Sequence, residues 1–500
     1  MKKTFKGITA FLTLAAMLAF TACGKTETNS EQSGENSVLA AQLDTDPKTG
    51  ISPPNETSAI SAKKGELTML HEPDCPGSLI PGIGCRNSVC YTENGYYYFG
   101  EYKSDDYPHL FYLDYATLQE VIVCSDSSCK HDTVNCASVF LDEYVFEYHL
   151  FVFQDHLYCL TTDIDQDGSL QSGGGFISDK LKEINDERES KRRASLYRMN
   201  LDGTERQRLW QSDAGYIAES EVFGDGTGFW FVTKQPSAEV HEETGAVYNH
   251  SKDRAFIRYD INERKITDKI PLEDCNNIAL RVDNCTGDKF FLLGKAYPNG
   301  TSIMDNMDIL APGTEIGSIN PDYWDFNDKC ECVYFTLDVK TKELREITRY
   351  KIADVNFGAD CRNGLLYFEK PDNSIFTLDI ESGETAELNI PEGYRFMGFF
   401  ADKLVLSHYP GDRNDRARYF ADPDGSNITR SGLLTNEGVD IDLITVVGDD
   451  ALVINGEFGI PSETSPGAYS CRTPLYALIS LDDLYNGRAN YKPFDMVNVS

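Results

Sequence analysis

Basic residues are scarce in this sequence of 500 residues, which has 46 lysines and arginines against 80 aspartates and glutamates, a net charge of −34. A nucleic-acid ligand would require a basic surface, so we expect no nucleic-acid partner. Cysteine is also rare, at 14 residues, which is too few for a fold built on disulfides. After residue 22 no apolar run reaches the roughly 18 residues that a membrane-spanning helix needs.

Familiar catalytic signatures are missing as well. The sequence contains no Gly-x-Ser-x-Gly nucleophile elbow and no phosphate-binding P-loop. Its eight histidines are scattered without a catalytic spacing. We therefore predict no catalytic residue, and the sequence favours a protein that is not an enzyme.

The N-terminus has the pattern of an export signal. Three lysines in the first six residues precede an uncharged stretch, residues 8–22, which is too short to span a bilayer permanently. The stretch runs into Phe-Thr-Ala-Cys-Gly at residues 20–24, which resembles the lipobox of bacterial lipoproteins. The resemblance implies a signal peptide over residues 1–22, lipidation of Cys23, and a position on the outer face of the cell membrane. An ordinary signal peptide is the alternative.

Residues 23–64 are rich in Ser, Thr, Glu, Asn, Gly and Pro. Such a composition buries too little apolar surface to offset the entropy of ordering, so we expect a flexible tether. About forty residues of this kind have an r.m.s. reach of roughly 35 Å. Residues 65–500 then form the folded part, held outside the membrane by its lipid anchor.

The folded part contains a repeated unit made of strands. A turn with Asn, Asp or Gly leads into an aromatic or apolar strand, and a second strand of the form aromatic-x-apolar-Asp follows. Seven copies are present. The first halves lie at residues 94–99, 155–158, 227–231, 287–291, 363–368, 402–405 and 449–453, and the second halves at 110–114, 196–200, 256–260, 333–338, 375–379, 418–422 and 475–479.

The copies at residues 196–204 and 375–383 resemble the repeat of TolB-like and YWTD-like β-propellers, and the chain resembles lipoproteins of anaerobic Gram-positive bacteria built from such repeats. The resemblance implies an all-β fold, a β-propeller of seven blades, with six or eight blades as alternatives. Two stacked β-sandwiches are the other architecture. We expect residues 66–74 to supply a strand that closes the ring with the last blade.

Four soft ligands lie within 13 residues: Cys124, Cys129, His131 and Cys136. Three thiolates and an imidazole would make a closed tetrahedral zinc site with a structural role. The sequence favours disulfides over zinc, because an exported chain permits them, and free thiols are a further alternative.

Several other cysteines bear on this choice. Candidate disulfide partners upstream are Cys75, Cys85 and Cys90, and further candidate pairs are Cys275 with Cys285 and Cys330 with Cys332. The last two are too close in sequence to bridge to each other easily, so a partner elsewhere is favoured. Cys159 lies inside an apolar strand and is expected to be a small buried side chain.

Asp163, Asp165 and Asp167, followed by Gly168, match the start of a calcium-binding loop. The acidic ligand expected at the twelfth position is missing, since Gly174 stands there. Two interpretations therefore remain: a calcium site that stiffens the surrounding insertion, and a plain acidic turn.

The polar insertions at residues 163–195, 234–254, 297–331 and 456–474 carry the aromatic residues Tyr248, Tyr297, Tyr323 and Trp324. Aromatic rings beside carboxylates can stack on sugars or hold a peptide, although any long loop contains such residues. We predict a binding or interaction module for an extracellular ligand or an envelope protein. The alternatives are a propeller hydrolase or lyase acting on an extracellular polymer, and a purely structural partner.

Overall fold

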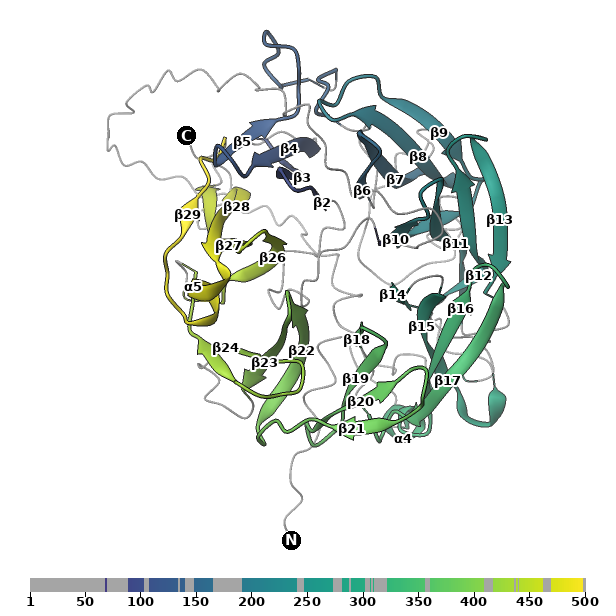
Figure 1. The fold of residues 1–500 in the computed structure, drawn as a ribbon. Coiled ribbons are helices and arrows are strands. Elements are labelled where there is room, and N and C mark those ends of the chain that lie inside the picture. The colour runs from purple at the N-terminus through teal and green to yellow at the C-terminus, as the bar shows by residue number, and fades with distance from the viewer. Residues whose placement is uncertain are drawn as a thin grey trace, which may run out of the picture.

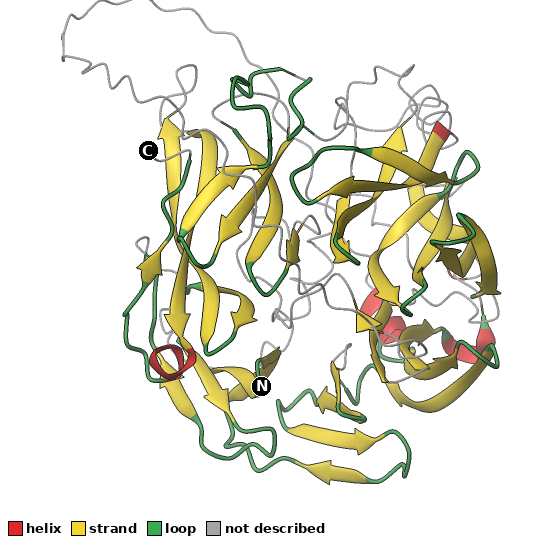
Figure 2. Ribbon diagram, turned by 45° about the horizontal axis from the view of Figure 1, so that its top comes forward, coloured by secondary structure: helices red, strands yellow, loops and turns green. Residues whose placement is uncertain are grey.

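A computed structural model describes most of the folded part of the chain. The described residues are 68–69, 89–102, 108–133, 135–139, 148–164, 191–240, 247–272, 281–286, 289–301, 306, 309, 322–355, 360–408, 417–435, 438, 440–461 and 469–497. They form strands and loops almost throughout, with a few short helices (Figure 2).

Seven small antiparallel sheets stand in chain order around a ring, so the all-β fold and the seven-bladed propeller are confirmed (Figure 1). Blade 1 consists of β2 (Val89–Tyr91), β3 (Gly95–Glu101), β4 (Pro108–Asp114) and β5 (Gln119–Ile122), and blade 2 of β6 (Tyr148–Phe153), β7 (His156–Ile164), β8 (Arg192–Asn200) and β9 (Gln207–Gln211). Blade 3 consists of β10 (Ile217–Gly224), β11 (Gly228–Val240), β12 (Val247–Asp260) and β13 (Lys265–Pro271), and blade 4 of β14 (Arg281–Thr286), β15 (Lys289–Ala296), β16 (Glu331–Asp338) and β17 (Glu343–Lys351). Blades 5 to 7 are β18 (Asp360–Arg362), β19 (Leu365–Glu369), β20 (Ile375–Asp379) and β21 (Thr385–Glu387); β22 (Tyr394–Phe400), β23 (Lys403–His408), β24 (Arg418–Ala421) and β25 (Thr429–Ser431); and β26 (Asp442–Val447), β27 (Asp450–Pro461), β28 (Tyr469–Ser480) and β29 (Lys492–Pro493).

The two halves of the sequence repeat correspond to the second and third strands of every blade. The first strand of each blade, which faces the centre of the ring (Figure 1), was not predicted. Those strands carry no shared turn or aspartate that would mark them in the sequence.

The aspartates that end the third strands each open a turn. In blade 1 the backbone N–H of Ala116 donates to Asp114 Oδ1 at 2.9 Å, and in blade 4 the N–H of Lys340 donates to Asp338 Oδ1 at 2.9 Å. Each carboxylate satisfies amides that the turn leaves without a ladder partner.

The core lies between neighbouring blades and is largely aromatic. Phe229 of blade 3, for example, packs edge-on against Phe151 and Tyr158 of blade 2, with ring centroids 4.9 Å apart in both cases. Each such fully buried ring stabilises the fold by about 1.5–3 kcal/mol. Cys159 is fully buried in the core between blades 1 and 2, as predicted.

The two faces of the ring differ in the length of their connections. The first and second strands of each blade are joined by two or three residues, as at Asn363 and Gly364 in blade 5, whose positive φ values of 51° and 79° suit a tight hairpin turn. The second and third strands are joined by longer segments, up to residues 297–330 in blade 4. Because strands alternate in direction, the blade-to-blade connections lie on the same side as these longer segments. We call the two sides the tight-turn face and the insertion face.

The prediction that residues 66–74 close the ring with the last blade is wrong. The strand in this segment, β1 (Thr68–Met69), pairs instead with β10 of blade 3. Blade 7 already has four strands of its own from the C-terminal part of the chain, so it leaves no place for an N-terminal strand.

The ring is closed by a C-terminal latch, residues 494–497. The N–H of Asp495 donates to the carbonyl of Leu118 at 2.9 Å, and the N–H of Glu120 donates to the carbonyl of Asp495 at 3.0 Å. Phe494 and Met496 are buried in the core between blades 7 and 1. The latch therefore ties the last blade to the outer strand of the first.

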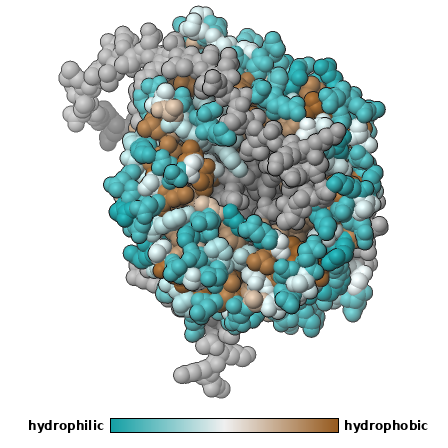
Figure 3. Space-filling model, viewed as in Figure 1, coloured by the Kyte–Doolittle hydropathy of each residue, from teal (hydrophilic) through white to brown (hydrophobic). Residues whose placement is uncertain are grey.

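On the side of the molecule seen in Figure 3, hydrophilic side chains cover most of the described surface, and apolar ones appear as separate patches. Within the described ranges, no helix is both long and apolar enough to cross a membrane.

Candidate metal centre

Cys124, Cys129, His131 and Cys136 meet in the connection between blade 1 and blade 2. Their sulfur atoms and one imidazole nitrogen all lie within 4.8 Å of one another. The three cysteines are thiols and form no disulfide. Residues spread over 13 positions of sequence thus converge on one point.

The spacing of the ligand atoms is compatible with a tetrahedral metal ion. His131 Nδ1 lies 3.3 Å from the Sγ of Cys136. With Zn–S bonds of about 2.3 Å and Zn–N bonds of about 2.0 Å, ligand atoms of a tetrahedral site are roughly 3.5–3.8 Å apart. A small adjustment of the side chains would bring all four to bonding distance.

Local turns bring the ligands together. The carboxylate of Asp126 accepts from the N–H of Ser128 at 2.8 Å, and the N–H of Cys129 donates to the carbonyl of Asp126 at 3.0 Å. His131 has a φ of 59°, a left-handed conformation that is rare for a residue with a side chain. This turn reverses the chain so that the imidazole faces the sulfurs.

Neighbouring groups donate hydrogen bonds or lie close to the sulfurs. The N–H of His131 donates to the Sγ of Cys129 at 3.4 Å, and the Sγ of Cys136 lies 3.0 Å from Ser138 Oγ. Ser138 Oγ in turn lies 2.8 Å from Nδ1 of His109. Such second contacts orient metal ligands and stabilise thiolate charge.

The centre rests on the insertion-face ends of blade 1. The His131 ring packs edge-on against the buried ring of Tyr102, at 6.1 Å between centroids, and Tyr102 packs against His109 at 5.5 Å. Tyr102 follows β3 and His109 lies near the start of β4, so the centre belongs to the insertion face.

Two further contacts hold the end of the loop. The guanidinium of Arg206, from blade 2, donates to the carbonyls of Ala137 at 2.6 Å and Val139 at 2.8 Å. The N–H of Leu110 donates to the carbonyl of Ser138 at 2.8 Å. The loop thereby bridges two adjacent blades.

The donor set selects the kind of metal and its role. Thiolates and imidazole suit zinc, whereas manganese and calcium prefer oxygen ligands. Four protein ligands fill a tetrahedral site and leave no open position for substrate, which is the mark of a structural centre. Partial burial raises the pKa of the Cys129 thiol, so the charged form needs a cation nearby.

The surrounding residues were not identified from the sequence. Ser138 follows Cys136 by two residues, but a serine there carries no signal of its own. Tyr102, His109 and Arg206 lie farther away in the sequence, and only the folded ring brings them to the loop.

The other predicted site residues divide into two groups. Cys330 and Cys332 are buried thiols, so the structure shows no disulfide at either. Other predicted positions lie outside the described residues or have side chains outside them: Cys23, Cys75, Cys85, Asp163, Asp165, Asp167, Gly168, Gly174, Tyr248, Cys275 and Cys285.

Aromatic residues of the insertions have mixed roles. Tyr297 is buried and stacks on Phe326 at 5.9 Å, so it is a core residue of its insertion. Trp324, in the short helix α4 (Tyr323–Asn327), is 36% exposed and packs edge-on against Tyr323 at 5.3 Å. Phe458, in the part of β27 that extends toward the insertion face, is 37% exposed.

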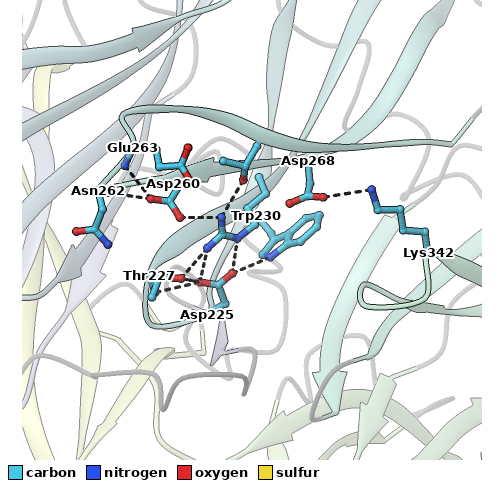
Figure 4. Close-up of polar contacts among 10 residues, drawn as sticks. Asp225, Thr227, Trp230, Asp260, Asn262, Glu263, Asp268 and Lys342 are labelled. Carbon is cyan, nitrogen blue, oxygen red and sulfur yellow. Dashed lines mark hydrogen bonds and ion pairs between the residues drawn. The ribbon is translucent and has the colours of Figure 1, made fainter.

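A second polar cluster lies at the tight-turn face of blade 3 (Figure 4). The guanidinium of Arg258 donates to Asp225 at 2.5 Å, to Asp260 at 3.0 Å and to Thr227 at 2.6 Å. The indole N–H of Trp230 donates to Asp225 at 3.2 Å. We call these five residues the Arg258 cluster.

The carboxylates of the Arg258 cluster are stabilised in their charged form by groups of the protein itself. Burial opposes ionisation of Asp225 and Asp260, but the hydrogen bonds that each accepts, including those from Arg258, outweigh burial and hold both pKa values below the ordinary range. Both carboxylates therefore stay charged at neutral pH. This cluster needs no ligand and fixes the turn between β10 and β11.

Comparisons with known proteins assign no family. No protein-family model matches the chain, and no curated protein matches it. Solved structures with a similar fold include an oligogalacturonate lyase in complex with manganese, at 12% identity and a TM-score of 0.32, over 67% of this chain and 73% of the lyase.

Two further structures extend this comparison. An oligogalacturonate lyase from Vibrio parahaemolyticus is 11% identical, with a TM-score of 0.37, over 81% of this chain and 85% of the lyase. A puromycin-hydrolyzing peptidase from Mycobacterium tuberculosis is 11% identical, with a TM-score of 0.44, over 89% of this chain and 56% of the peptidase. At these identities the similarity concerns the propeller fold alone.

These structures correct one prediction. The sequence favoured a protein that is not an enzyme, but the structures of similar fold are those of enzymes, both lyases and peptidases.

Proposed function

We propose that this protein is a lipid-anchored, extracytoplasmic β-propeller that recognises an extracellular ligand on its insertion face. Lipidation of Cys23 and a tether over residues 24–64 would hold the ring outside the membrane. Zinc bound by Cys124, Cys129, His131 and Cys136 would fix one loop of the recognition surface.

The observation that carries this proposal is where apolar side chains are exposed. Among the described residues, the exposed large apolar side chains are Trp324 at 36%, Leu434 at 47% and Phe458 at 37%. All three lie on the insertion face: Trp324 in the connection between the second and third strands of blade 4, Phe458 in the last part of β27, and Leu434 in the connection between blades 6 and 7. Exposed aromatic rings on loops held by a rigid scaffold are typical of recognition surfaces.

A hydrolase or lyase acting on an extracellular polymer would use the same face, because polymer must first be held there. One experiment should therefore measure both binding of a ligand and its conversion to products. The purified full-length protein is applied to glycan and peptide arrays, and each ligand that binds is incubated with the protein and examined for products by mass spectrometry.

The variants Trp324→Ala and Phe458→Ala test the face directly. Each is expected to weaken binding by about tenfold, as for an aromatic side chain at the centre of an interface. Lys265→Ala, at a 63% exposed side chain at the start of β13 on the tight-turn face, is the control and should bind normally. Unchanged binding in both aromatic variants, or reproducible silence on the arrays and in pull-downs from native membranes, would refute recognition at this face.

The zinc proposal is tested by metal content. The purified protein is expected to contain one equivalent of zinc by plasma mass spectrometry, and Cys136→Ser is expected to lose it. Cys159→Ala, which removes a buried thiol outside the centre, should keep its zinc. Wild-type protein without zinc after expression in zinc-supplied cells would rule the centre out.

A further inference from the structure

The short strand β1 lies on the channel side of blade 3. In that sheet the order of strands is β1-β10-β11-β12-β13, and β10 is the innermost strand of the blade. β1 is therefore inside the ring, where it pairs with the edge that β10 presents to the channel. It is the first described part of the chain, only a few residues after the predicted tether.

The register of this pairing gives the direction of the chain. Thr68 is opposite Gly224 and Met69 is opposite Phe223, in antiparallel orientation. Gly224 is the last residue of β10 and leads directly into the tight turn toward β11. The chain thus lies at the tight-turn end of the channel at Thr68 and points toward the insertion face at Met69.

The start of the first blade agrees with this direction. β2 begins at Val89, and first strands begin at the insertion face and end at the tight-turn face. The chain is at the tight-turn end at Thr68 and at the insertion end at Val89. Thr68, the first described residue, therefore lies at the tight-turn end of the channel.

The docking place of β1 is rigid. Phe223 is fully buried, and the turn that follows Gly224 is held by the Arg258 cluster. A strand that adds to a sheet edge gains main-chain hydrogen bonds whatever its side chains. Backbone pairing to a fixed edge can therefore determine where the tether leaves the ring.

We propose that β1 orients the whole ring on the membrane. With the lipid on Cys23, the tether leaves through the tight-turn face, so this face is held toward the membrane and the insertion face is directed outward. This inference rests on the proposed lipid anchor. It deepens the proposed function, since the ligand would then approach from the medium and not from the lipid surface.

The dimensions make this orientation measurable. The tether has an r.m.s. reach of roughly 35 Å. A strand such as β19, with five residues, separates the two faces by roughly 17 Å of backbone. Acceptors in the membrane should therefore distinguish a probe on one face from a probe on the other.

Two exposed acidic residues offer matched probe positions. Glu93 lies in the tight turn between β2 and β3, and Asp372 lies in the short connection between β19 and β20 on the insertion face. A clickable amino acid is encoded at either position in the full-length lipidated protein. Each product is labelled, reconstituted into vesicles with acceptor-labelled headgroups, and examined by energy transfer.

Transfer from position 93 is expected to be about twofold or more higher than transfer from position 372, given a tether of this reach and a ring of this height. Equal transfer, or greater transfer from position 372, would overturn the proposal. The double variant Thr68→Pro, Met69→Pro should lose the difference and keep its β-sheet circular dichroism. A full difference in that variant would also overturn it, because β1 would then have no part in the orientation.

A separate flotation experiment tests the lipid anchor itself. Cys23→Ala is expected to stop floating with vesicles and native membranes. If this variant still floats as the wild type does, the lipid anchor is wrong. If it is released while positions 93 and 372 give equal transfer, the anchor holds and the orientation fails.

Discussion

The candidate metal centre and the Arg258 cluster differ in where the cation that stabilises their polar side chains comes from. Both bring several polar side chains together at a turn. In the Arg258 cluster two carboxylates surround one guanidinium of the same blade, so the cation that holds the carboxylates together is a side chain of the protein (Figure 4). In the metal centre three thiols and an imidazole converge, and the cation that suits them has to come from solution. The turn of the Arg258 cluster is held by the protein's own charges, whereas the longer loop would need a bound cation.

The largest effect should come from removing the metal. Treating the zinc-loaded protein with a strong chelator is expected to lower the free energy of unfolding by more than about 4 kcal/mol, because a structural metal binds the folded state alone. Urea denaturation measures the change. Limited proteolysis should then cut first within residues 124–136, while the Arg258 cluster stays protected. Identical urea midpoints with and without chelator would contradict a structural role.

Loss of the internal cation should come next. Arg258→Ala leaves Asp225 and Asp260 partly buried without their counter-ion, and is expected to cost about 3–5 kcal/mol. The control is Arg349→Ala, whose side chain is 47% exposed and pairs with Glu331 and Glu346 on the surface. That change should cost less than about 1 kcal/mol. Equal costs for the two variants would mean that burial of the cluster contributes nothing.

A third arrangement lies where β5 meets the C-terminal latch: a buried carboxylate that accepts hydrogen bonds from neutral donors. Glu120 accepts hydrogen bonds from the hydroxyl of Tyr98 and from the N–H of Val497, the latter at 2.6 Å. Burial raises its pKa from 4.5 to about 7, against the effect of these hydrogen bonds, and nearby Asp495 raises it further. Folding therefore favours the protonated form.

The pH dependence of folding stability follows from the raised pKa of Glu120. Glu120 imposes no penalty below pH 4.5, where it is protonated in both the folded and the unfolded chain. As pH rises through about 7, the folded protein should lose about 3 kcal/mol of stability from this group. The stability difference between wild type and Glu120→Gln, measured from pH 4 to 8, isolates this loss from other carboxylates. A difference that does not change with pH would refute the raised pKa.

The smallest effect concerns a glycine beside the Arg258 cluster. A Cβ added to Gly228 would lie 2.4 Å from the carbonyl oxygen of Tyr259, so Gly228→Ala should cost about 1–3 kcal/mol through displacement of backbone. At Gly364 the added Cβ meets open space, and only its φ of 79° opposes a side chain. Gly364→Ala should therefore cost about 1 kcal/mol. Urea denaturation of both variants compares steric contact with backbone strain.

Much of the ring could be predicted from sequence because its signals are local. The turn before each second strand and the aspartate after most third strands recur, so both strands of all seven blades were located. The first strands were missed because their pattern depends on which blade lies on either side. The closing strand was predicted wrongly for a related reason: whether Thr68 and Met69 pair with blade 7 or blade 3 depends on which sheet edge is vacant.

The candidate metal site likewise has residues that the sequence identified and residues that it did not. The four ligand types and their close spacing identify Cys124, Cys129, His131 and Cys136 as one group from the sequence. Their spacing alone did not distinguish a metal site from disulfides, since both bring sulfurs together. Tyr102 and Arg206 could not be found, because they reach the loop from a turn and a blade whose proximity is set by the ring.

The sequence by itself determined the blade unit, its sevenfold repetition and the ligands of the metal centre, since each depends on residues near one another in the chain. Tertiary structure decided which face carries the insertions, that the C-terminal latch closes the ring, and that β1 lies in the channel. These outcomes depend on strand direction and on vacant sheet edges, which exist only after the seven blades have packed around a common axis.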